Sequence, residues 1–242
     1  MKASKSTDIR KVLSITFHTE DVKSILADRK TSTRKLVTFL SGKNPFWSGY
    51  IKDGLMLYNG TNEPCIKKAP YSVGDILYVR ETWKCMKVSE YDATADIMYK
   101  AGGDRLRMQL TYGKTDSINR DEFDRFIKKG FSNSEEWKPS ATMPKEAARI
   151  WLKVINIRLE RLQNITVEDC KKEGIWDDYK TYCEEYTENL RKVAYPKVFS
   201  RIWDSELSKS KKEKYCWQNN PWVWVIDFER CGEPEKERSR DE

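Results

Sequence analysis

The sequence predicts an α+β fold built on a small mixed β-barrel or curled sheet, with flanking helices and sizeable helical and loop insertions. Two observations lead to this fold class. Segments with strand character outnumber the helices with a clear apolar face, and the strands lie far apart along the chain. The sequence also lacks the regular alternation of strands and helices that is typical of a parallel α/β sheet.

The first predicted elements are a strand over residues 12–17 and a short helix that follows it. Thr19 is suited to cap the N-terminus of this helix, and two acidic residues come next, where the helix dipole favours negative charge. Apolar residues then recur at helical spacing. The helix therefore ends where the basic stretch "LADRKTSTRK", residues 26–35, begins.

Three further strands are predicted. Residues 76–80 follow a Gly-Asp turn and are mostly apolar. Residues 150–159 alternate apolar and charged side chains, with an interruption at Val154 and Ile155 that indicates a bend or a bulge. Residues 222–226 are apolar on both faces, which is typical of a buried central strand.

A short helix is predicted between the last two of these strands. Thr166 and Asp169 form a variant of the capping box, in which each residue satisfies a backbone N–H group of the other. The helix should stop at Gly174, because glycine commonly ends helices in a left-handed conformation.

Other segments are interpreted as insertions. Residues 41–71 are rich in glycine and proline and predict loops. Residues 103–137 are polar and contain one amphipathic helix ending at Gly130, and we place this segment outside the core. A long helical segment over residues 179–207 contains Pro196, which predicts a kink or a break.

Composition indicates a folded and highly charged protein. Charged residues make up 34% of the 242 residues, and the 12% of aromatic residues argues against disorder. The net charge of +7 is consistent with a nucleic-acid partner, although it is spread along the chain. Four cations are clustered in the basic stretch: Arg29, Lys30, Arg34 and Lys35.

Several classes of site are excluded by missing residues and motifs. The six cysteines are scattered without a CxxC pair and His18 is the single histidine, so no metal and no other cofactor is expected. A GxGxxG motif, a P-loop and a nucleophile elbow are all missing, which argues against dinucleotide-binding, NTP-binding and α/β-hydrolase functions. With no signal sequence and no apolar run long enough to cross a membrane, we expect a cytoplasmic protein with reduced thiols.

The basic stretch contains the first candidate site. Lys30 and Thr33 are three residues apart, so a helical turn would place an amine and a hydroxyl on one face. An amine kept neutral by nearby cations such as Arg29 and Arg34 can activate a hydroxyl as a nucleophile. Residue types alone favour the alternative, a basic helix C-terminus that compensates the helix dipole.

Two more candidates lie elsewhere. Glu173 precedes Gly174 at a helix C-terminus, where a carboxylate opposes the dipole, so a role other than helix stability is indicated. Its alternative is an ordinary solvated glutamate. Trp47 lies in a polar loop where it would be suited to stack on a base, and packing over a core edge is the alternative.

Four passages of the sequence, taken together, point to one protein family more specifically than any single passage does. In chain order they are "ILADRKTSTRK", "VGDILYVRETW", "LQNITVEDCKKEGI" and "WVWVIDFE". This order and wording resemble the ASCH family, a branch of the PUA-like fold. The passages "WKPSATMPKEAARIWLKV" and "NPWVWVIDFER" are similar to phage and prophage proteins that carry an ASCH domain.

The resemblance implies a single PUA-like domain over residues 1–232, with a frayed charged tail over residues 233–242. The parts that match the family are residues 12–37, 71–83, 144–176 and 217–230. The insertions would then be residues 38–70, 84–143 and 177–216. Asp28 stands where small ASCH enzymes commonly have glycine, which bears on the turn before the basic stretch.

The resemblance also implies an activity. PUA-like domains generally bind RNA or modified nucleobases, and one small bacterial ASCH branch hydrolyses the amide of N4-acetylcytidine. By motif, the catalytic residues of that branch fall on Lys30, Thr33 and Glu173 of this chain. Lys30 would act as base, Thr33 as nucleophile and Glu173 as the group that orients the leaving nitrogen, with a backbone N–H group near Thr31 as oxyanion donor.

Two functions therefore remain open at this point. The first is a nucleoside- or RNA-directed amidohydrolase that removes an acyl group from a modified cytidine. The alternative is a binding module without chemistry, whose cleft grips a nucleoside or single-stranded RNA. The residues expected to contact the ligand are Arg29, Thr31, Arg34, Arg80 and Trp47.

Overall fold

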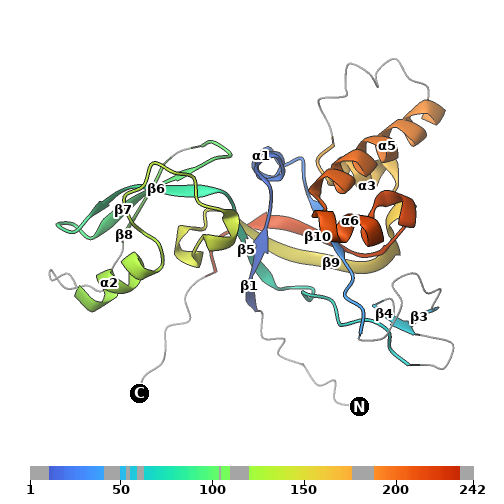
Figure 1. Cartoon of the computed structure of the whole chain (residues 1–242), viewed down its shortest axis with the longest axis horizontal. Coiled ribbons are helices and arrows are strands. Elements are labelled where there is room, and N and C mark those ends of the chain that lie inside the picture. Colours follow the sequence, from blue (N-terminus) through green and yellow to red (C-terminus); the bar gives the residue numbers. More distant parts are fainter. Residues whose placement is uncertain are drawn as a thin grey trace, which may run out of the picture. The chain divides into compact units, whose positions relative to one another are not determined.

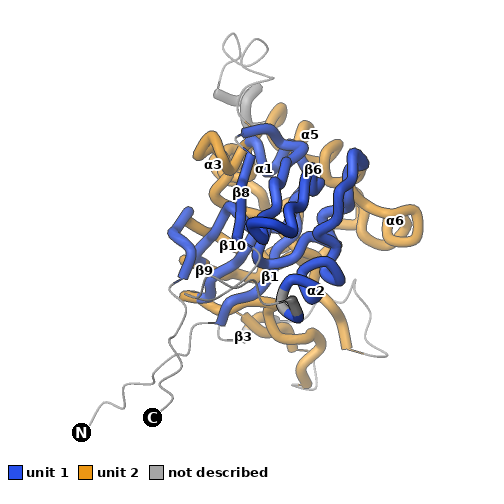
Figure 2. The backbone as a smooth tube through the Cα atoms, turned by 90° about the vertical axis from the view of Figure 1, so that its left-hand side faces the viewer, with its two compact units in different colours: residues 1–23, 75–153, 230–242 blue, residues 24–74, 154–229 orange. Residues whose placement is uncertain are grey.

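The structure is a computed structural model of the whole chain (Figure 1). It describes residues 11–40, 50–52, 55–58, 63–103, 105–109, 120–175 and 188–234. The chain divides into two compact units (Figure 2). Unit 1 consists of residues 1–23, 75–153 and 230–242, and unit 2 of residues 24–74 and 154–229. Each unit is composed of segments that are distant in the sequence.

The main sheet has five strands in the order β1-β5-β9-β10-β2. Their bounds are β1 (Val12–Thr16), β2 (Ser32–Leu36), β5 (Ile76–Arg80), β9 (Trp151–Arg161) and β10 (Trp222–Cys231). β1 and β5 are parallel, whereas β5 pairs antiparallel with β9 and β2 pairs antiparallel with β10. The protein is therefore an α+β fold with a mixed sheet, as the sequence predicts. A closed barrel is not formed, because β1 and β2 remain the two edges of the described sheet.

The strands predicted from the sequence are confirmed. In β9 the alternation of buried and exposed side chains is interrupted where Ile155 and Asn156 are both exposed, at the position where the sequence indicates a bend or bulge. β10 is buried from Trp222 to Phe228, and it lies inside the sheet between β9 and β2. A run that is apolar on both faces forms this strand because both of its faces are covered.

Unit 1 also contains a three-stranded sheet and a helix. Its elements are β6 (Trp83–Ser89), β7 (Thr94–Tyr99), β8 (Leu106–Gln109), α2 (Arg120–Lys128), and the 3-10 turns η1 (Ser140–Thr142) and η2 (Lys145–Ala147). Helix α2 is followed by Gly130 with a φ of 99°, as expected for a glycine that ends a helix.

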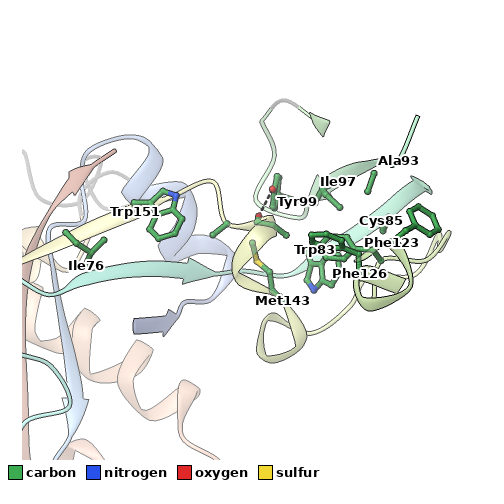
Figure 3. Packing of buried hydrophobic residues seen from close by; sticks show 14 residues of the cluster. Ile76, Trp83, Cys85, Ala93, Ile97, Tyr99, Phe123, Phe126, Met143 and Trp151 are labelled. Carbon is green, nitrogen blue, oxygen red and sulfur yellow. Dashed lines mark hydrogen bonds between the residues drawn. The ribbon is translucent and has the colours of Figure 1, made fainter. Parts of the chain in front are cut away.

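The interpretation of residues 103–137 as lying outside the core is wrong for the described residues 120–131. Phe123, Phe126 and Phe131 are at most 4% exposed and pack in one cluster with Trp83 and Ile97 (Figure 3). The ring of Phe131 lies edge-on to Trp83 with centroids 5.6 Å apart, a favoured arrangement for aromatic pairs. The polar composition of this segment obscured its three inward-facing aromatic residues.

A buried ion pair lies beside this cluster. Arg149 donates from Nε to Glu81 Oε1 at 2.8 Å and from Nη2 to Oε2 at 2.9 Å, and Glu81 is 1% exposed. The guanidinium also lies over the Tyr99 ring, 4.0 Å from its centroid. Tyr99 in turn donates its hydroxyl hydrogen to Ala147 O at 2.7 Å (Figure 3). Burial raises the pKa of Glu81 above its ordinary value of 4.5, although Arg149 acts in the opposite direction.

This raised pKa gives a prediction for stability. A carboxyl group whose pKa is higher in the folded state stabilises the fold below its unfolded pKa, and this contribution is lost as pH rises through the folded pKa. We therefore expect the difference in unfolding free energy between the wild type and Glu81→Gln to fall as pH rises above 4.5. Urea unfolding of both proteins at a series of pH values measures this difference. A difference that grows with pH would show that pairing with Arg149 outweighs burial.

Unit 2 contains the helices that matter for the candidate site. Helix α1 (Thr19–Leu26) begins in unit 1 and ends in unit 2. The others are α3 (Val167–Lys172), α5 (Glu188–Glu206) and α6 (Lys209–Tyr215), with the 3-10 turns η3 (Leu162–Asn164) and η4 (Trp217–Asn219) and the strands β3 (Tyr50–Lys52) and β4 (Met56–Tyr58). Pro196 does not break α5, which continues through it.

The core of unit 2 joins the helices to β10. Phe199 and Trp203 of α5 pack with Val223 and Val225 of β10 and with Cys170 of α3. Burial raises the pKa of the Cys170 thiol to about 12, so this cysteine has the character of a core residue. In the part of the chain that the structure describes, no helix is long and apolar enough to cross a membrane.

Candidate functional site in unit 2

The basic stretch is extended, not helical. After α1 the chain turns at Asp28, whose φ of 54° lies in the left-handed region that glycine adopts most easily. The N–H groups of Arg29 and Lys30 both donate to Ser24 O, at 2.8 and 3.1 Å. From residue 32 the chain continues as strand β2. The premise that a helical turn places Lys30 and Thr33 on one face is therefore wrong.

Helix α3 holds the second half of the site. Thr166 caps it as predicted: its side chain accepts from Asp169 N, and the Asp169 carboxylate accepts from Thr166 N at 3.1 Å. The helix ends at Lys172 with Glu173 as its C-cap, and Gly174 follows with a φ of 90°. Thr31 N–H donates to Lys172 O at 2.8 Å, so the last turn of α3 is joined to the start of β2.

The structure brings Lys30 and Glu173 into direct contact. Lys30 Nζ lies 2.7 Å from Glu173 Oε2 and also donates to the Glu173 carbonyl oxygen at 3.0 Å. Arg34 Nη1 donates to Glu173 Oε1 at 3.0 Å. Each oxygen of one carboxylate is thus bound by its own cation. The three side chains are 4%, 6% and 1% exposed for Lys30, Glu173 and Arg34 respectively, so the group is removed from water.

Thr33 is not part of this contact. Successive side chains of a strand point to opposite faces. Lys30 and Arg34 reach the same carboxylate, so they share a face of the chain, and Thr33 belongs to the opposite one. Thr33 pairs with Ile226 of β10 and is 6% exposed. Two of the three residues implied as catalytic are therefore adjacent, and the third lies across the strand.

The ionic group extends into β9 and β10. Arg34 Nη2 lies 3.5 Å from Asp169 Oδ2, and Arg158 donates to Asp169 Oδ1 at 2.8 Å and to Asp227 Oδ2 at 2.7 Å. Glu160 pairs with both arginines. We call this set the ionic network; its members are Lys30, Arg34, Arg158, Glu160, Asp169, Glu173 and Asp227.

Electrostatics keep Asp169 ionised in this network. Burial acts to raise the pKa of Asp169, but hydrogen bonds from Thr166 and the charges of Arg34 and Arg158 outweigh it and hold the pKa below 3.8. Asp169 therefore acts in two ways, as the capping-box residue of α3 and as an anion between two arginines. An anion held in this way stabilises the fold above its unfolded pKa and loses that contribution as pH falls through the folded one.

Beside the ionic network lies an open depression of about 440 Å³. It is lined by Asp28, Arg29, Thr31, Glu168, Lys171 and Lys172. Three of these residues are cationic, two are anionic and one carries a hydroxyl, and all belong to unit 2. Lys30 and Glu173 do not line it, although each is next in sequence to residues that do.

Helix α5 covers the network and borders the depression. The Arg34 guanidinium lies over the Phe199 ring, 5.7 Å from its centroid, and Lys171 Nζ lies 5.9 Å from the centroid of Tyr195. Both aromatic residues come from the segment that the sequence indicates as an insertion over residues 177–216. This insertion is therefore part of the surroundings of the site.

Two of the predicted residues are not part of the described site in unit 2. Arg80 belongs to unit 1, where its Nε donates to Met143 O at 3.1 Å. Trp47 lies outside the described residues. Arg158, Asp227 and Lys171 belong to the site or its surroundings although no sequence motif indicates them there. The alternation of apolar and charged residues over 150–159 is a signal for Arg158. A charged residue on a strand that packs against the core is expected to have an oppositely charged partner nearby.

The arrangement has two chemical capacities. The depression presents cations and a hydroxyl that suit an anionic or polar ligand. The Lys30–Glu173 contact allows a proton to move between an amine and a carboxylate at 2.7 Å without a change in net charge. Comparison of the chain with family models, with curated proteins and with solved structures gave no match.

Proposed function

We propose that this chain is a PUA-like protein of the ASCH type that binds a nucleoside or single-stranded RNA in the depression of unit 2. One observation carries the proposal: the buried Lys30–Glu173–Arg34 contact fixes the basic stretch against the end of α3. This contact joins residues that are 143 positions apart. Its effect is to hold Arg29 and Thr31 on the same depression as Lys171 and Lys172.

The lining fits the parts of a nucleotide. Arg29, Lys171 and Lys172 would bind phosphate oxygens, since Arg and Lys are the usual partners of phosphate. Asp28 and Glu168 would accept hydrogen bonds from the amino groups of a base. Binding without chemistry accounts for the burial of Lys30, Thr33 and Glu173, which then support the depression without contacting the ligand.

Removal of two cations tests this site. We expect the double variant Lys171→Gln and Lys172→Gln to lose at least about tenfold in affinity for a short single-stranded RNA, roughly 1.4 kcal/mol. The matched control is Lys67→Gln with Lys68→Gln, two exposed lysines of unit 2 that do not line the depression. Fluorescence anisotropy with labelled RNA at fixed salt gives both affinities. Equal losses in the two variants would refute binding in the depression.

The amidohydrolase is the second candidate, and the contact of Lys30 with Glu173 favours it. In this mechanism the proton of Lys30 Nζ passes to the Glu173 carboxylate, and the neutral amine then takes the proton of Thr33 or of a water. The attacking oxygen adds to the acyl carbon of N4-acylated cytidine, and the bond between that carbon and the exocyclic nitrogen breaks as Glu173 gives its proton to the departing nitrogen. Attack by water releases the acid directly, whereas attack by Thr33 leaves an ester on its Oγ that a water then hydrolyses to release the acid and restore the hydroxyl.

The reaction needs the covering residues to open, because Lys30 and Thr33 are only 5% and 6% exposed. Thr33 can serve as the nucleophile only if its hydroxyl also comes to the face of the strand that carries Lys30, whereas a water needs no such change.

Hydrolysis of free N4-acetylcytidine distinguishes the two candidates. Thr33→Val is the informative variant, because it removes the hydroxyl, keeps the side-chain shape and leaves the ionic network intact. Acetate release by the wild type that is abolished in Thr33→Val would establish the amidohydrolase with Thr33 as nucleophile. If the wild type binds RNA but does not hydrolyse N4-acetylcytidine, the amidohydrolase is refuted for this substrate and the binding function is supported.

A further inference from the structure

A cluster of lysines lies on α6, away from the depression. All four lysines of the helix are solvent-exposed, and Glu213 is its single acidic residue. They are Lys209, Lys211, Lys212 and Lys214. Within the described part of the chain, none of the four forms an ion pair with a carboxylate. We call these residues the α6 lysines.

The stability of the helix explains only two of the α6 lysines, Lys212 and Lys214, which lie in the last turn, where the helix dipole favours positive charge. Lys209 and Lys211 lie in the first turn, which holds no acidic residue and where the helix dipole disfavours positive charge. Lys209 and Lys212 are three apart, as are Lys211 and Lys214, and like charges at helical spacing repel each other. Ser208 at the N-cap makes no side-chain hydrogen bond that would compensate. The charges of Lys209 and Lys211 therefore oppose the preferences of a short helix.

The helix is held firmly despite this charge. The indole N–H of Trp203 in α5 donates to Tyr215 O at 2.8 Å. The backbone N–H of Trp217, just after α6, donates to Asp204 Oδ1 at 2.7 Å. The Trp217 ring lies edge-on to Phe199 of the unit 2 core. The α6 lysines are thus presented on a fixed support, and only their side chains need to be ordered when a ligand binds.

The position of α6 points to an extended ligand. Figure 2 shows α6 at the outer edge of unit 2, on a different side from α3, whose last turn lines the depression. A ligand confined to the depression cannot contact α6, because no residue of α6 lines it. A polymer with regularly spaced negative charges can, and clusters of lysine on one helix are a common phosphate-binding surface.

We propose that the α6 lysines bind the phosphate backbone of a single-stranded RNA whose other part occupies the depression, so that the ligand is a polynucleotide. This inference rests on the proposed function, because it uses the depression as the second point of contact. The α6 lysines carry no base readout in this arrangement. They supply affinity that depends on salt and on the length of the RNA.

Two labelled RNAs of about 4 and about 16 nucleotides, lengths typical of single-strand sites, test the proposal. The variant K209Q/K211Q/K212Q/K214Q should bind the long RNA at least about tenfold more weakly and the short RNA unchanged. The slope of log affinity against log salt should fall by about 0.7 for each phosphate that the variant no longer neutralises. The control K67Q/K68Q/K87Q/K100Q removes the same charge at four other exposed lysines and should match the wild type.

The outcomes separate this proposal from the proposed function. Equal weakening by the control variant, or an unchanged affinity of the α6 variant for the long RNA, overturns the role of α6. If the α6 variant binds polyglutamate more weakly than the wild type but binds RNA normally, the partner of the α6 lysines is an acidic protein. This result would also refute RNA binding by α6. The Lys171 and Lys172 variant could bind the short RNA normally while the α6 variant fails to bind the long one. This result would refute binding in the depression and support RNA binding by the α6 lysines.

Discussion

Replacement of Glu173 by glutamine is expected to lower the free energy of unfolding by about 3–5 kcal/mol, the usual cost of leaving a buried charge without its partner. The variant keeps the size of the side chain, but Lys30, 4% exposed, then loses the carboxylate that lies 2.7 Å from its Nζ. Arg34 is affected less, because Asp169 and Glu160 lie within 3.6 Å of its Nη2. Urea unfolding of the variant and the wild type at neutral pH measures the difference.

Two further variants make this result specific. Glu20→Gln removes one partner of the exposed Glu20–Lys23 pair, and such surface pairs contribute about 0–1 kcal/mol. Adding Lys30→Met to Glu173→Gln removes the stranded charge and should recover part of the stability. A decrease below about 1 kcal/mol for Glu173→Gln would mean that the pair is hydrated in solution.

Substitution of Gly174 by alanine should destabilise the fold by about 2–4 kcal/mol, through a strained backbone and a crowded neighbourhood. The φ of 90° is unfavourable for any side chain, and a Cβ there would lie 3.0 Å from Ser24 Cβ and 3.3 Å from Lys30 Cβ. Relief of the crowding would displace Lys30 from Glu173. Thermal or urea unfolding of the variant gives the magnitude.

Gly74 provides a matched control for this substitution. Its φ of 92° is nearly the same, and a Cβ there would meet nothing within 4 Å. Gly74→Ala should therefore show the backbone contribution alone, about 1 kcal/mol. Equal destabilisation at Gly74 and Gly174 would show that the space around Ser24 and Lys30 adapts freely.

The local elements of this fold could be predicted, because their signals lie within a few residues. The Thr166–Asp169 capping box and the glycine that follows Glu173 define α3 from both ends. The apolar run of residues 222–226 identified an interior strand. The burial of the phenylalanines of residues 120–131 escaped prediction, because the helical spacing indicated an amphipathic helix but not which core its apolar face would join.

The site could be predicted only in part. Lys30 and Glu173 are in contact, and sequence motif had singled out both. Their contact depends on the pairing of segments 143 residues apart, which no local pattern reveals. Arg34 was expected to bind a ligand, but its neighbours across the sheet surround it with carboxylates. The assumed helical turn at Lys30 failed because strand pairing with β10 outweighed local propensity.

The join between α3 and β2 also bears on solubility. An edge strand offers unpaired N–H and C=O groups to other chains and is a common starting point for aggregation. β2 is an edge of the described sheet, yet the N–H of Thr31 just before it is occupied by Lys172 O, and the charged side chain of Arg34 points inward from it. The bond that positions the basic stretch thus also shields the start of this edge, so loosening α3 would expose a template for self-association.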